Sequence, residues 1–317
     1  METTRRRVRR ALCAIGLGLA AAPVCGELAY RWIRAPHLGP TTHPAYVAWD
    51  PELGWAYVPD ASVRHRSEEF DVEVRIHSRG FRGEEWSLEA SAAARVLVLG
   101  DSFAFGWGVE EHERFSARLA AEFPHWLVVN AAVSGYGTDQ ELLVLRRLVD
   151  EVRPDLVVCV FCANDLYENA GALSYGKPKP RFVLTGEELG PLIPPVEPSW
   201  IARHSQLWRG VAKLRWERNH ARREASPGQE WSLTLALLSA MKEAAGPATL
   251  LIVSEGEVPR KRLSDFTSAH AGITHLDLDS STGGSGLDRF EEDGHWTAVG
   301  HAEVAAALSK RLRGWRP

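Results

Sequence analysis

The sequence predicts a three-layer α/β fold with a parallel central sheet, and two observations lead to this class. From Arg95 onward, short runs of Val, Leu and Ile alternate with longer segments of helical periodicity, as in βαβ units. The strand-like runs are almost continuously apolar, which is typical of parallel strands buried on both faces. The 317 residues, 45% hydrophobic and 25% charged, suffice for one sizeable core with appendages.

Five runs are expected to form the strands of this sheet, joined by right-handed crossovers. They are residues 95–99, 126–130, 156–161, 248–253 and, more weakly, 273–278. Helical spacing predicts helices at 110–123, from 139 to 149, at 229–245 and at 298–312. The glycine- and aromatic-rich residues 103–108 are expected to form a loop.

Residues 167–226 interrupt this alternation and form an expected insertion. The prolines in 177–180 and 191–198 exclude regular structure there. Ser199 is then expected to cap an amphipathic helix whose apolar residues include Trp200, Trp208 and Leu214, with basic residues over much of the remainder. A lid helix that packs on the body is the favoured interpretation. A helix that lies on an anionic membrane or binds an acidic polymer is the alternative.

The N-terminus predicts a membrane segment in residues 1–35. Five arginines between positions 5 and 10 precede the apolar stretch 11–24, and continuation to Ile33 supplies the ~20 residues of a span. Pro23 follows Ala20-Ala21-Ala22 and disfavours cleavage. We expect an uncleaved single-pass anchor in the inner membrane, with the arginines cytoplasmic and the remainder periplasmic or extracellular. A signal peptide that is cleaved to release a secreted protein is the alternative.

Residues 36–94 are expected to form a small β-rich extension and a linker that precede the main domain, 95–317. Phe70 to Ile76 alternates apolar and polar side chains with period two, as a half-exposed strand does. Residues 87–94 are mostly small and predict the linker.

Charge and cysteine usage exclude two classes. A net charge of −4, without a basic stripe in the core region, argues against nucleic-acid binding. Cys159 and Cys162 have CxxC spacing, but within an apolar strand they point to opposite faces. Neither a disulfide nor a metal pair is expected, and buried, unreactive thiols are predicted.

Three predicted strands end at residues able to support acyl transfer. Ser102 follows the first, Gly135 the second and Asn164 the third. Open α/β sheets place ligands at this edge. A serine on a strand-to-helix turn is a candidate nucleophile, a glycine N–H can approach a ligand closely, and an asparagine amide can donate to an oxyanion.

A fourth stretch supplies a base and a carboxylate. His295 precedes the last predicted helix, and Asp293 lies two residues before it. In an extended Asp293-Gly294-His295 segment, both side chains lie on the same side of the backbone. Glu292, three residues before the histidine, is the alternative carboxylate.

Taken together, these residues resemble the motifs of SGNH hydrolases of the GDSL esterase/lipase superfamily. The motifs are Gly100-Asp101-Ser102-Phe103, Asn130 to Gly135, Ala163-Asn164-Asp165 and Asp293-Gly294-His295. The resemblance covers residues 95–312 and implies a flavodoxin-like sheet with no metal or organic cofactor. It also implies Ser102 as nucleophile, His295 as base, Asp293 as its orienting acid, and an oxyanion hole formed by the Ser102 N–H, the Gly135 N–H and the Asn164 side chain.

A finer resemblance concerns the substrate. Asp293-Gly294-His295-Trp296 is similar to the D-x-H-W motif of membrane-associated polysaccharide O-acetyltransferases. With the anchor and residues 76–83, the chain resembles anchored SGNH proteins that accompany envelope polysaccharide genes. We therefore expect an esterase acting on an O-acyl group of a carbohydrate. An O-acetyltransferase using the same residues and a non-catalytic carbohydrate-binding protein are the alternatives.

Overall fold

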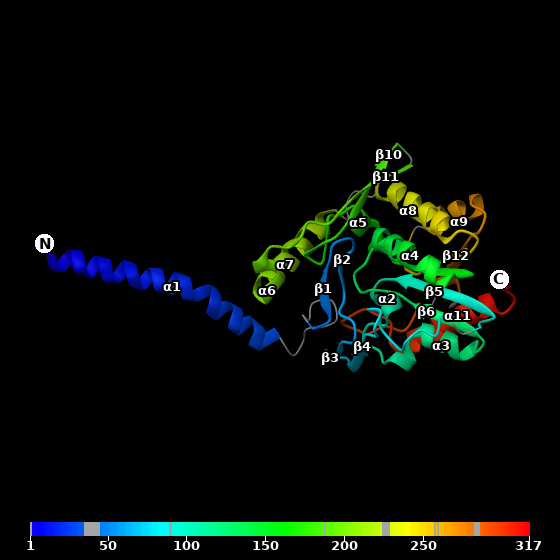
Figure 1. The fold of residues 1–317 in the computed structure, drawn as a ribbon, viewed down its shortest axis with the longest axis horizontal. Coiled ribbons are helices and arrows are strands. Elements are labelled where there is room, and N and C mark those ends of the chain that lie inside the picture. The colour runs from blue at the N-terminus through cyan, green and yellow to red at the C-terminus, as the bar shows by residue number, and fades with distance from the viewer. Residues whose placement is uncertain are drawn as a thin grey trace.

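The centre of the molecule is a five-stranded parallel sheet. The computed structural model describes residues 2–34, 45–88, 91–186, 188–223, 229–256, 258, 260–281 and 286–317. The strand order is β13-β12-β7-β5-β6 (Figure 1). The strands are β5 (Ala94–Gly100), β6 (Trp126–Asn130), β7 (Leu156–Phe161), β12 (Thr249–Ser254) and β13 (Ile273–Asp277). The predicted α/β class and its five parallel strands are confirmed.

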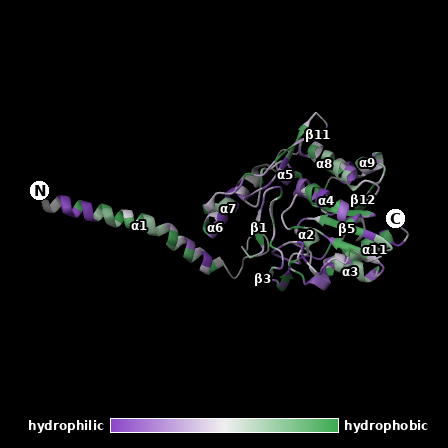
Figure 2. Ribbon diagram, in the orientation of Figure 1, coloured by the Kyte–Doolittle hydropathy of each residue, from purple (hydrophilic) through white to green (hydrophobic). Residues whose placement is uncertain are grey.

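Helices cover both faces of this sheet. Helices α3 (Phe115–Glu122) and α11 (Ala298–Leu312) pack together on one face, and α4 (Thr138–Val152) and α8 (Gln229–Ala245) pack together on the other (Figure 1). Helix α9 (Arg260–Ala269), which the sequence reading missed, leads from β12 to β13, and the single turn α10 (Leu278–Ser281) follows β13. The three middle strands β12, β7 and β5 are largely hydrophobic (Figure 2), and apart from Thr249 and Arg95 their residues are buried.

Two local expectations around the first crossover are wrong. Residues 103–108 do not form only a loop, because Ser102 begins the single turn α2 (Ser102–Phe105), which ends at Gly106 with φ +83°. The predicted helix 110–123 is split into a 3₁₀ turn, η2 (Glu111–Glu113), and α3. Arg114 separates the two pieces with extended backbone angles (φ −59°, ψ 141°). Elements of one turn are too short for apolar periodicity to reveal.

The extension consists of two antiparallel hairpins. β1 (Val47–Asp50) pairs with β2 (Gly54–Tyr57), and β3 (Ser62–Arg66) pairs with β4 (Asp71–Arg75). Val72 and Val74 are buried while Asp71 and Arg75 are exposed, so the alternation predicted for this strand is confirmed. Residue 35 of the predicted anchor, residues 36–44 of the predicted extension and residues 89–90 of the predicted linker lie outside the described residues.

The insertion contains more regular structure than its prolines suggested. After α5 (Asp165–Asn169), β8 (Leu173–Ser174) pairs with β9 (Lys177–Pro178), and β10 (Arg181–Thr185) pairs with β11 (Glu188–Ile193). The exclusion of strands at 177–180 and 191–198 is therefore wrong in part. Each of these hairpins has only two strands, so every strand is an edge strand, where proline is tolerated.

The single helix expected after Ser199 is two helices. Ser199 caps α6 (Trp200–His204), its Oγ accepting from the Ala202 N–H at 3.3 Å. The backbone becomes extended at Ser205, and α7 (Gln206–Arg223) begins.

Helix α1 (Glu2–Arg34) projects from the body as one long helix (Figure 1). Its stretch Arg5–Ile33 has the length and apolarity needed to cross a membrane, which a signal sequence also has. Figure 2 shows the hydrophilic arginines at its start and more apolar residues beyond them.

The cysteines are all free thiols. Cys159 is buried on β7, and Cys162 lies just beyond the end of that strand. Burial raises the pKa of both thiols well above the ordinary value, so neither is a thiolate at neutral pH. The prediction of unreactive thiols fits this environment.

Candidate active site

Ser102, His295 and Asp293 form a continuous hydrogen-bonded chain. The Ser102 Oγ lies 2.7 Å from the His295 Nε2, and the His295 Nδ1 lies 2.5 Å from the Asp293 Oδ1. An ionised carboxylate only accepts hydrogen bonds, so the proton between His295 and Asp293 belongs to Nδ1. Nε2 is then free to take the serine proton. This is the geometry of a nucleophile, a base and an orienting acid.

A tight turn places Ser102 at the end of β5. Gly100 has φ +152°, and a Cβ there would lie 2.6 Å from the Ala104 Cβ and 3.1 Å from the Val160 Cβ. Only glycine fits this position without displacing either neighbour. The Asp101 carboxylate then caps α2 by accepting from the Phe103 N–H at 2.9 Å. Ser102 is 8% exposed at the carboxyl edge of the sheet.

The loop before α11 is arranged so that Asp293 reaches the histidine. Gly294, between the two residues, has φ +81°, a conformation that favours glycine. The N–H groups of Glu292 and Asp293 both donate to the Glu69 carboxylate, at 3.1 and 2.8 Å. The Glu292 side chain is exposed, and the carboxylate that accepts from the His295 Nδ1 is that of Asp293.

Trp107 was not identified from the sequence, although it contacts both members of this pair. Its Nε1 donates to the Asp293 Oδ2 at 3.1 Å, and its ring stacks on that of His295 with centroids 5.4 Å apart. Burial raises the pKa of Asp293, but the hydrogen bonds from His295 and Trp107 outweigh it and leave the pKa below the ordinary value. Asp293 is therefore ionised at neutral pH.

The extension also contributes to this side of the site. Glu69 holds the Asp293 backbone, and the His65 ring lies edge-on to Trp107 with centroids 4.4 Å apart. Burial lowers the pKa of His65 to about 4, so it packs as a neutral ring. Neither residue could be identified from the sequence. Glu69 binds a segment more than 200 residues away, and His65 contacts a single aromatic side chain, so no local motif marks either residue.

The two other candidate oxyanion donors follow the strands that flank β5. Gly135 has φ +81°, and a Cβ there would approach the Tyr175 ring to 3.0 Å. Asn164 lies beyond β7, with its Nδ2 3.4 Å from the Asp101 Oδ2 and 3.5 Å from the Glu168 Oε1. Because β6, β5 and β7 are neighbours in a parallel sheet, their carboxyl ends bring Gly135, Ser102 and Asn164 to one edge.

Glu168 and Ser174 connect these two donors. The Ser174 Oγ lies 2.9 Å from the Gly135 carbonyl oxygen and 3.1 Å from the Glu168 Oε2. A hydroxyl has one hydrogen, so both contacts are hydrogen bonds only if Glu168 is protonated and donates to Ser174. Burial, partly opposed by Lys179, raises the pKa of Glu168 to about 8, which supplies that proton at neutral pH.

Further buried carboxyl groups lie behind the site. Burial also raises the pKa values of Asp101, Glu141 and Asp165. Burial raises the pKa of Asp139 as well, partly opposed by Lys179, with which it forms a buried ion pair. Among the described residues, no three His, Cys, Asp or Glu side chains are arranged to hold a metal ion.

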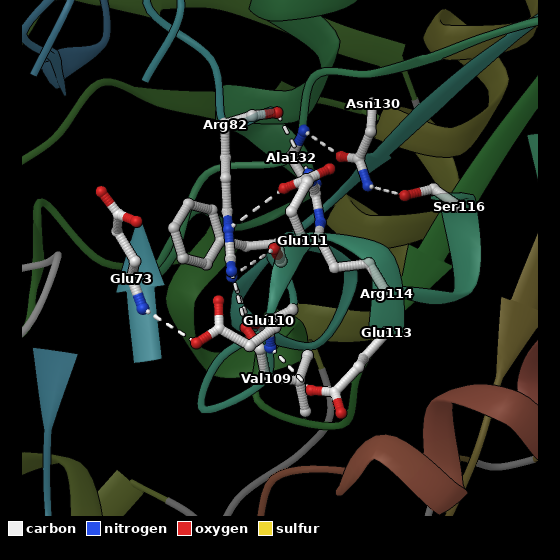
Figure 3. Close-up of polar contacts among 12 residues, drawn as sticks. Glu73, Arg82, Val109, Glu110, Glu111, Glu113, Arg114, Ser116, Asn130 and Ala132 are labelled. Carbon is white, nitrogen blue, oxygen red and sulfur yellow. Dashed lines mark hydrogen bonds and ion pairs between the residues drawn. The ribbon is translucent and has the colours of Figure 1, made fainter. Parts of the chain in front are cut away.

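Arg82, on the segment after β4, supports the loop that follows Ser102. Its guanidinium donates to the carbonyls of Gly106 and Val109, at 2.5 and 2.6 Å, and lies 5.1 Å from the centre of the Phe105 ring. Figure 3 shows it beside Glu111 and Arg114. Burial lowers the pKa of Arg82 to about 10, so it stays charged at neutral pH.

The extension also holds the loop that carries Gly135. The Tyr57 hydroxyl accepts from the Ser134 N–H at 3.0 Å, and the Tyr136 hydroxyl donates to the Trp55 carbonyl. At the start of α4, the Gln140 Nε2 donates to the Leu53 carbonyl at 2.7 Å. The two hairpins therefore contact the nucleophile loop, the Gly135 loop and the Asp293 loop.

Comparison with known proteins places this site within a family. The GDSL-like lipase/acylhydrolase family matches residues 98–303, a range that contains Ser102, Gly135, Asn164, Asp293 and His295. No curated protein matches the chain significantly.

Solved structures that are similar to the chain have low sequence identity to it. A G-D-S-L lipolytic protein from Veillonella parvula is 10% identical over 69% of this chain and 98% of its own (TM-score 0.44). A GDSL-like lipase from Bacteroides thetaiotaomicron is 16% identical over 70% and 88% (TM-score 0.41). A family 3 carbohydrate esterase from Clostridium thermocellum is 12% identical over 68% and 94% (TM-score 0.40). Since the family match covers more than half of its residues, the chain belongs to the GDSL-like lipase/acylhydrolase family.

Proposed function

We propose that this protein is a membrane-anchored serine esterase that removes an O-acyl group, such as acetyl, from a carbohydrate. The observation that carries the proposal is the chain of hydrogen bonds from Ser102 through His295 to Asp293. Membership of an acylhydrolase family supports ester hydrolysis. The carbohydrate part rests on the similarity of Asp293-Gly294-His295-Trp296 to the D-x-H-W motif.

In the first half-reaction, the Ser102 Oγ attacks the acyl carbonyl carbon while the His295 Nε2 takes the hydroxyl proton. The carbonyl oxygen becomes an oxyanion, stabilised by the N–H groups of Ser102 and Gly135 and by the Asn164 amide. Asp293 stabilises the imidazolium and keeps its Nδ1 protonated. When the tetrahedral intermediate collapses, the sugar oxygen leaves with the proton from Nε2, and the acyl group stays on Ser102.

In the second half-reaction, a water molecule replaces the sugar. His295 takes a proton from the water, whose oxygen attacks the acyl carbon within the same oxyanion hole. Collapse of this second intermediate releases the carboxylic acid and returns the proton to Ser102. Every proton moved in the cycle passes through the His295 Nε2.

An O-acetyltransferase is the second candidate, favoured by the two-residue spacing of Asp293 and His295. A sugar hydroxyl would replace water in the second half-reaction, and the acyl-Ser102 intermediate would be the same. Because the two reactions share this intermediate, they differ only in the acceptor.

We further propose that α1 anchors the protein in the inner membrane, with residues 5–10 cytoplasmic and the body on the periplasmic or extracellular side. The arginines on one side of an apolar span support this orientation. In this arrangement the chain divides into an anchor (1–35), an extension with linker (36–94) and a catalytic domain (95–317) with the insertion at 167–226.

The test uses the full chain in detergent, incubated with an activated acetyl ester with and without oligosaccharide acceptors. Acetate release by the wild type and not by Ser102→Ala supports the esterase. Acetylated sugar formed at the expense of acetate supports the transferase. No reaction on any acetyl ester, from protein with a cooperative thermal unfolding transition, contradicts both and favours a binding protein.

A further inference from the structure

Helix α7 has three faces in contact with three different surroundings, and the first is the body of the protein. The Trp216 Nε1 donates to the Leu173 carbonyl at 3.0 Å, and its ring lies 4.7 Å from that of Tyr175. Ala212 packs so closely on Gly176 that a Cβ on this glycine would lie 2.6 Å from the Ala212 backbone. One side of α7 is thus fixed on the β8–β9 hairpin of the insertion, which we call the insertion hairpin.

The second face of α7 contacts α1. A Cβ on Gly26 would lie 3.3 Å from the Leu207 side chain, and a Cβ on Gly210 would lie 2.4 Å from the Tyr30 hydroxyl. These two glycines allow the helices to approach closely.

Glu27 of α1 also caps the start of α7. Its carboxylate accepts from the N–H groups of Gln206 and Leu207, at 2.7 and 3.0 Å, and from the Ser205 Oγ at 2.7 Å. The Arg31 guanidinium donates to the His204 carbonyl at 2.7 Å. The first turn of α7 is therefore tied to the last two turns of α1.

The third face is exposed, apolar and basic. Trp208, Val211 and Leu214 are 48%, 38% and 59% exposed. At 100° per residue, these side chains and the exposed Arg215 and Arg218 lie within an arc of about 120°. We call these five residues the outer face of α7. Leu207 falls in the same arc, so α1 covers this side only at the start of the helix and leaves it exposed from Trp208 onward. Tryptophan and arginine beside aliphatic side chains are typical of helices that lie in the headgroup region of a membrane.

The contacts with α1 place the outer face at the depth of a membrane surface. A span of ~20 residues that begins after Arg10 ends near Tyr30, because a helix rises 1.5 Å per residue and the hydrocarbon core is ~30 Å thick. Gly26, Glu27, Tyr30 and Arg31, which contact α7 and the segment just before it, therefore lie where the helix leaves the bilayer. Trp200, which is 68% exposed, begins the short helix α6, and the carbonyl of His204 at the end of α6 accepts from Arg31.

We propose that the outer face of α7 binds the surface of a phospholipid bilayer that contains anionic lipid, on the side where the catalytic body lies. This rests on the proposed anchoring by α1. The bilayer is the occupant because the face adjoins the membrane helix and pairs apolar side chains with positive charge. Tied to both α1 and the insertion hairpin, α7 then fixes the orientation of the body toward the membrane, where envelope carbohydrate is accessible.

The experiment measures quenching of tryptophan fluorescence by brominated lipid acyl chains. The full-length Trp32→Phe variant, which lacks the exposed tryptophan at the end of α1, is reconstituted in nanodiscs of phosphatidylcholine and phosphatidylglycerol. Bromination is expected to quench part of its fluorescence, and Trp200→Phe with Trp208→Phe added is expected to abolish the quenched part. Trp216→Phe, on the body-facing side of the same helix, is the matched control and is expected to leave that part unchanged.

Each other outcome has a defined meaning. If bromination quenches Trp32 in the wild type but nothing in the Trp32→Phe variant, α1 is inserted while the outer face is not on the lipid, and the inference is wrong. If Trp32 is not quenched either, the anchoring itself fails. Quenching that is equal without phosphatidylglycerol contradicts the role of Arg215 and Arg218. Protection of Trp208 together with two copies per nanodisc would assign the face to a second copy of the chain.

Discussion

Asp293 and Glu292 carry the same functional group on adjacent residues, and the backbone decides which one reaches His295. Glu69 accepts from both of their N–H groups, and Gly294 adopts the positive φ that turns the chain toward the imidazole. Asp293 is then 2.5 Å from Nδ1, and Trp107 holds its second oxygen. A carboxylate that does not accept from Nδ1 cannot fix the tautomer of His295, so we assign this role to Asp293 and not to Glu292.

We predict that Asp293→Asn lowers kcat by about 10⁴-fold, because the carboxylate fixes the tautomer of the base and stabilises its charged form. Glu292→Gln, the matched control, is expected to change kcat less than about threefold, as an exposed side chain that does not touch the reacting groups. Steady-state hydrolysis of an activated acetyl ester measures both. If Glu292→Gln lowers kcat strongly and Asp293→Asn lowers it only slightly, Glu292 is the carboxylate that orients His295.

Glu168 predicts an alkaline limit to activity. Below its pKa of about 8 the carboxyl is neutral and can donate to Ser174, which donates to the Gly135 carbonyl. Above it, a negative charge lies 3.5 Å from the Asn164 Nδ2 and repels the oxyanion, so kcat is expected to fall by about tenfold or more. Glu168→Gln stays neutral, and its kcat is expected to remain level between pH 8 and 9.5.

The control for the pH dependence of kcat is a variant of another titrating group close to Glu168. Its electrostatic neighbours are Asp101, Glu141, Asp165, Tyr175, Lys177 and Lys179. Burial lowers the pKa of Lys177 to about 7, so this group also titrates in the range. Lys177→Met is expected to retain an alkaline fall in kcat. A fall that disappears in Lys177→Met and persists in Glu168→Gln would refute the assignment.

At the scale of elements, the extension completes the site. Its hairpins and the segment after β4 contact the loops that carry Ser102, Gly135 and Asp293, through Tyr57, Glu69 and Arg82. Arg82 is 2% exposed, and its guanidinium donates to the Gly106 and Val109 carbonyls in the interior. These carbonyls would otherwise be buried without a donor.

We predict that Arg82→Met lowers the free energy of unfolding by about 3 kcal/mol, since it removes two charge-assisted hydrogen bonds and leaves buried carbonyls without donors. Arg79→Met, three residues earlier, removes a partly exposed ion pair with Glu151 and is expected to cost less than about 1 kcal/mol. Denaturant unfolding compares the two. Equal losses would show that Arg82 is no more important to the fold than a surface arginine.

The long elements could be predicted from the sequence, whereas the short ones could not. The five strands and the helices at 138–152, 229–245 and 298–312 carry enough periodic residues to be recognised. The turn α2 and the break at Ser205 depend on a capping side chain or one residue's backbone angles. Ser102, Gly135, Asn164 and His295 follow from strand ends and motifs, but Trp107, Glu69 and Arg82 act through tertiary contacts that no local spacing encodes.

At the scale of the whole molecule, the question is where the body lies relative to the membrane. The basic residues precede the apolar part of α1, and the proposed catalytic body follows it. Glu27 and Arg31 of α1 contact the start of α7 and the segment before it, which supports the proposal that α1 stays attached to the body. Cleavage of a signal peptide just before residue 27 would remove the Gly26 contact with Leu207, and the new mature N-terminus would reveal it.

We predict that a reporter fused after residue 40 is active when it requires the periplasm and inactive when it requires the cytoplasm, because the arginines stay inside. N-terminal sequencing of the mature protein is expected to find residues 5–10 intact. The opposite reporter pattern would reverse the topology. A mature N-terminus between residues 23 and 27 would instead identify a secreted protein.

The central claim is that Ser102 is the nucleophile activated by His295, and covalent labelling tests it most directly. The full-length protein is treated with a fluorophosphonate, and the modified residue is identified by mass spectrometry. We expect one adduct, on the Ser102 Oγ, formed at a rate that falls by orders of magnitude in His295→Ala and absent in Ser102→Ala. An adduct on another residue, or a Ser102 that reacts equally fast without His295, would contradict the account.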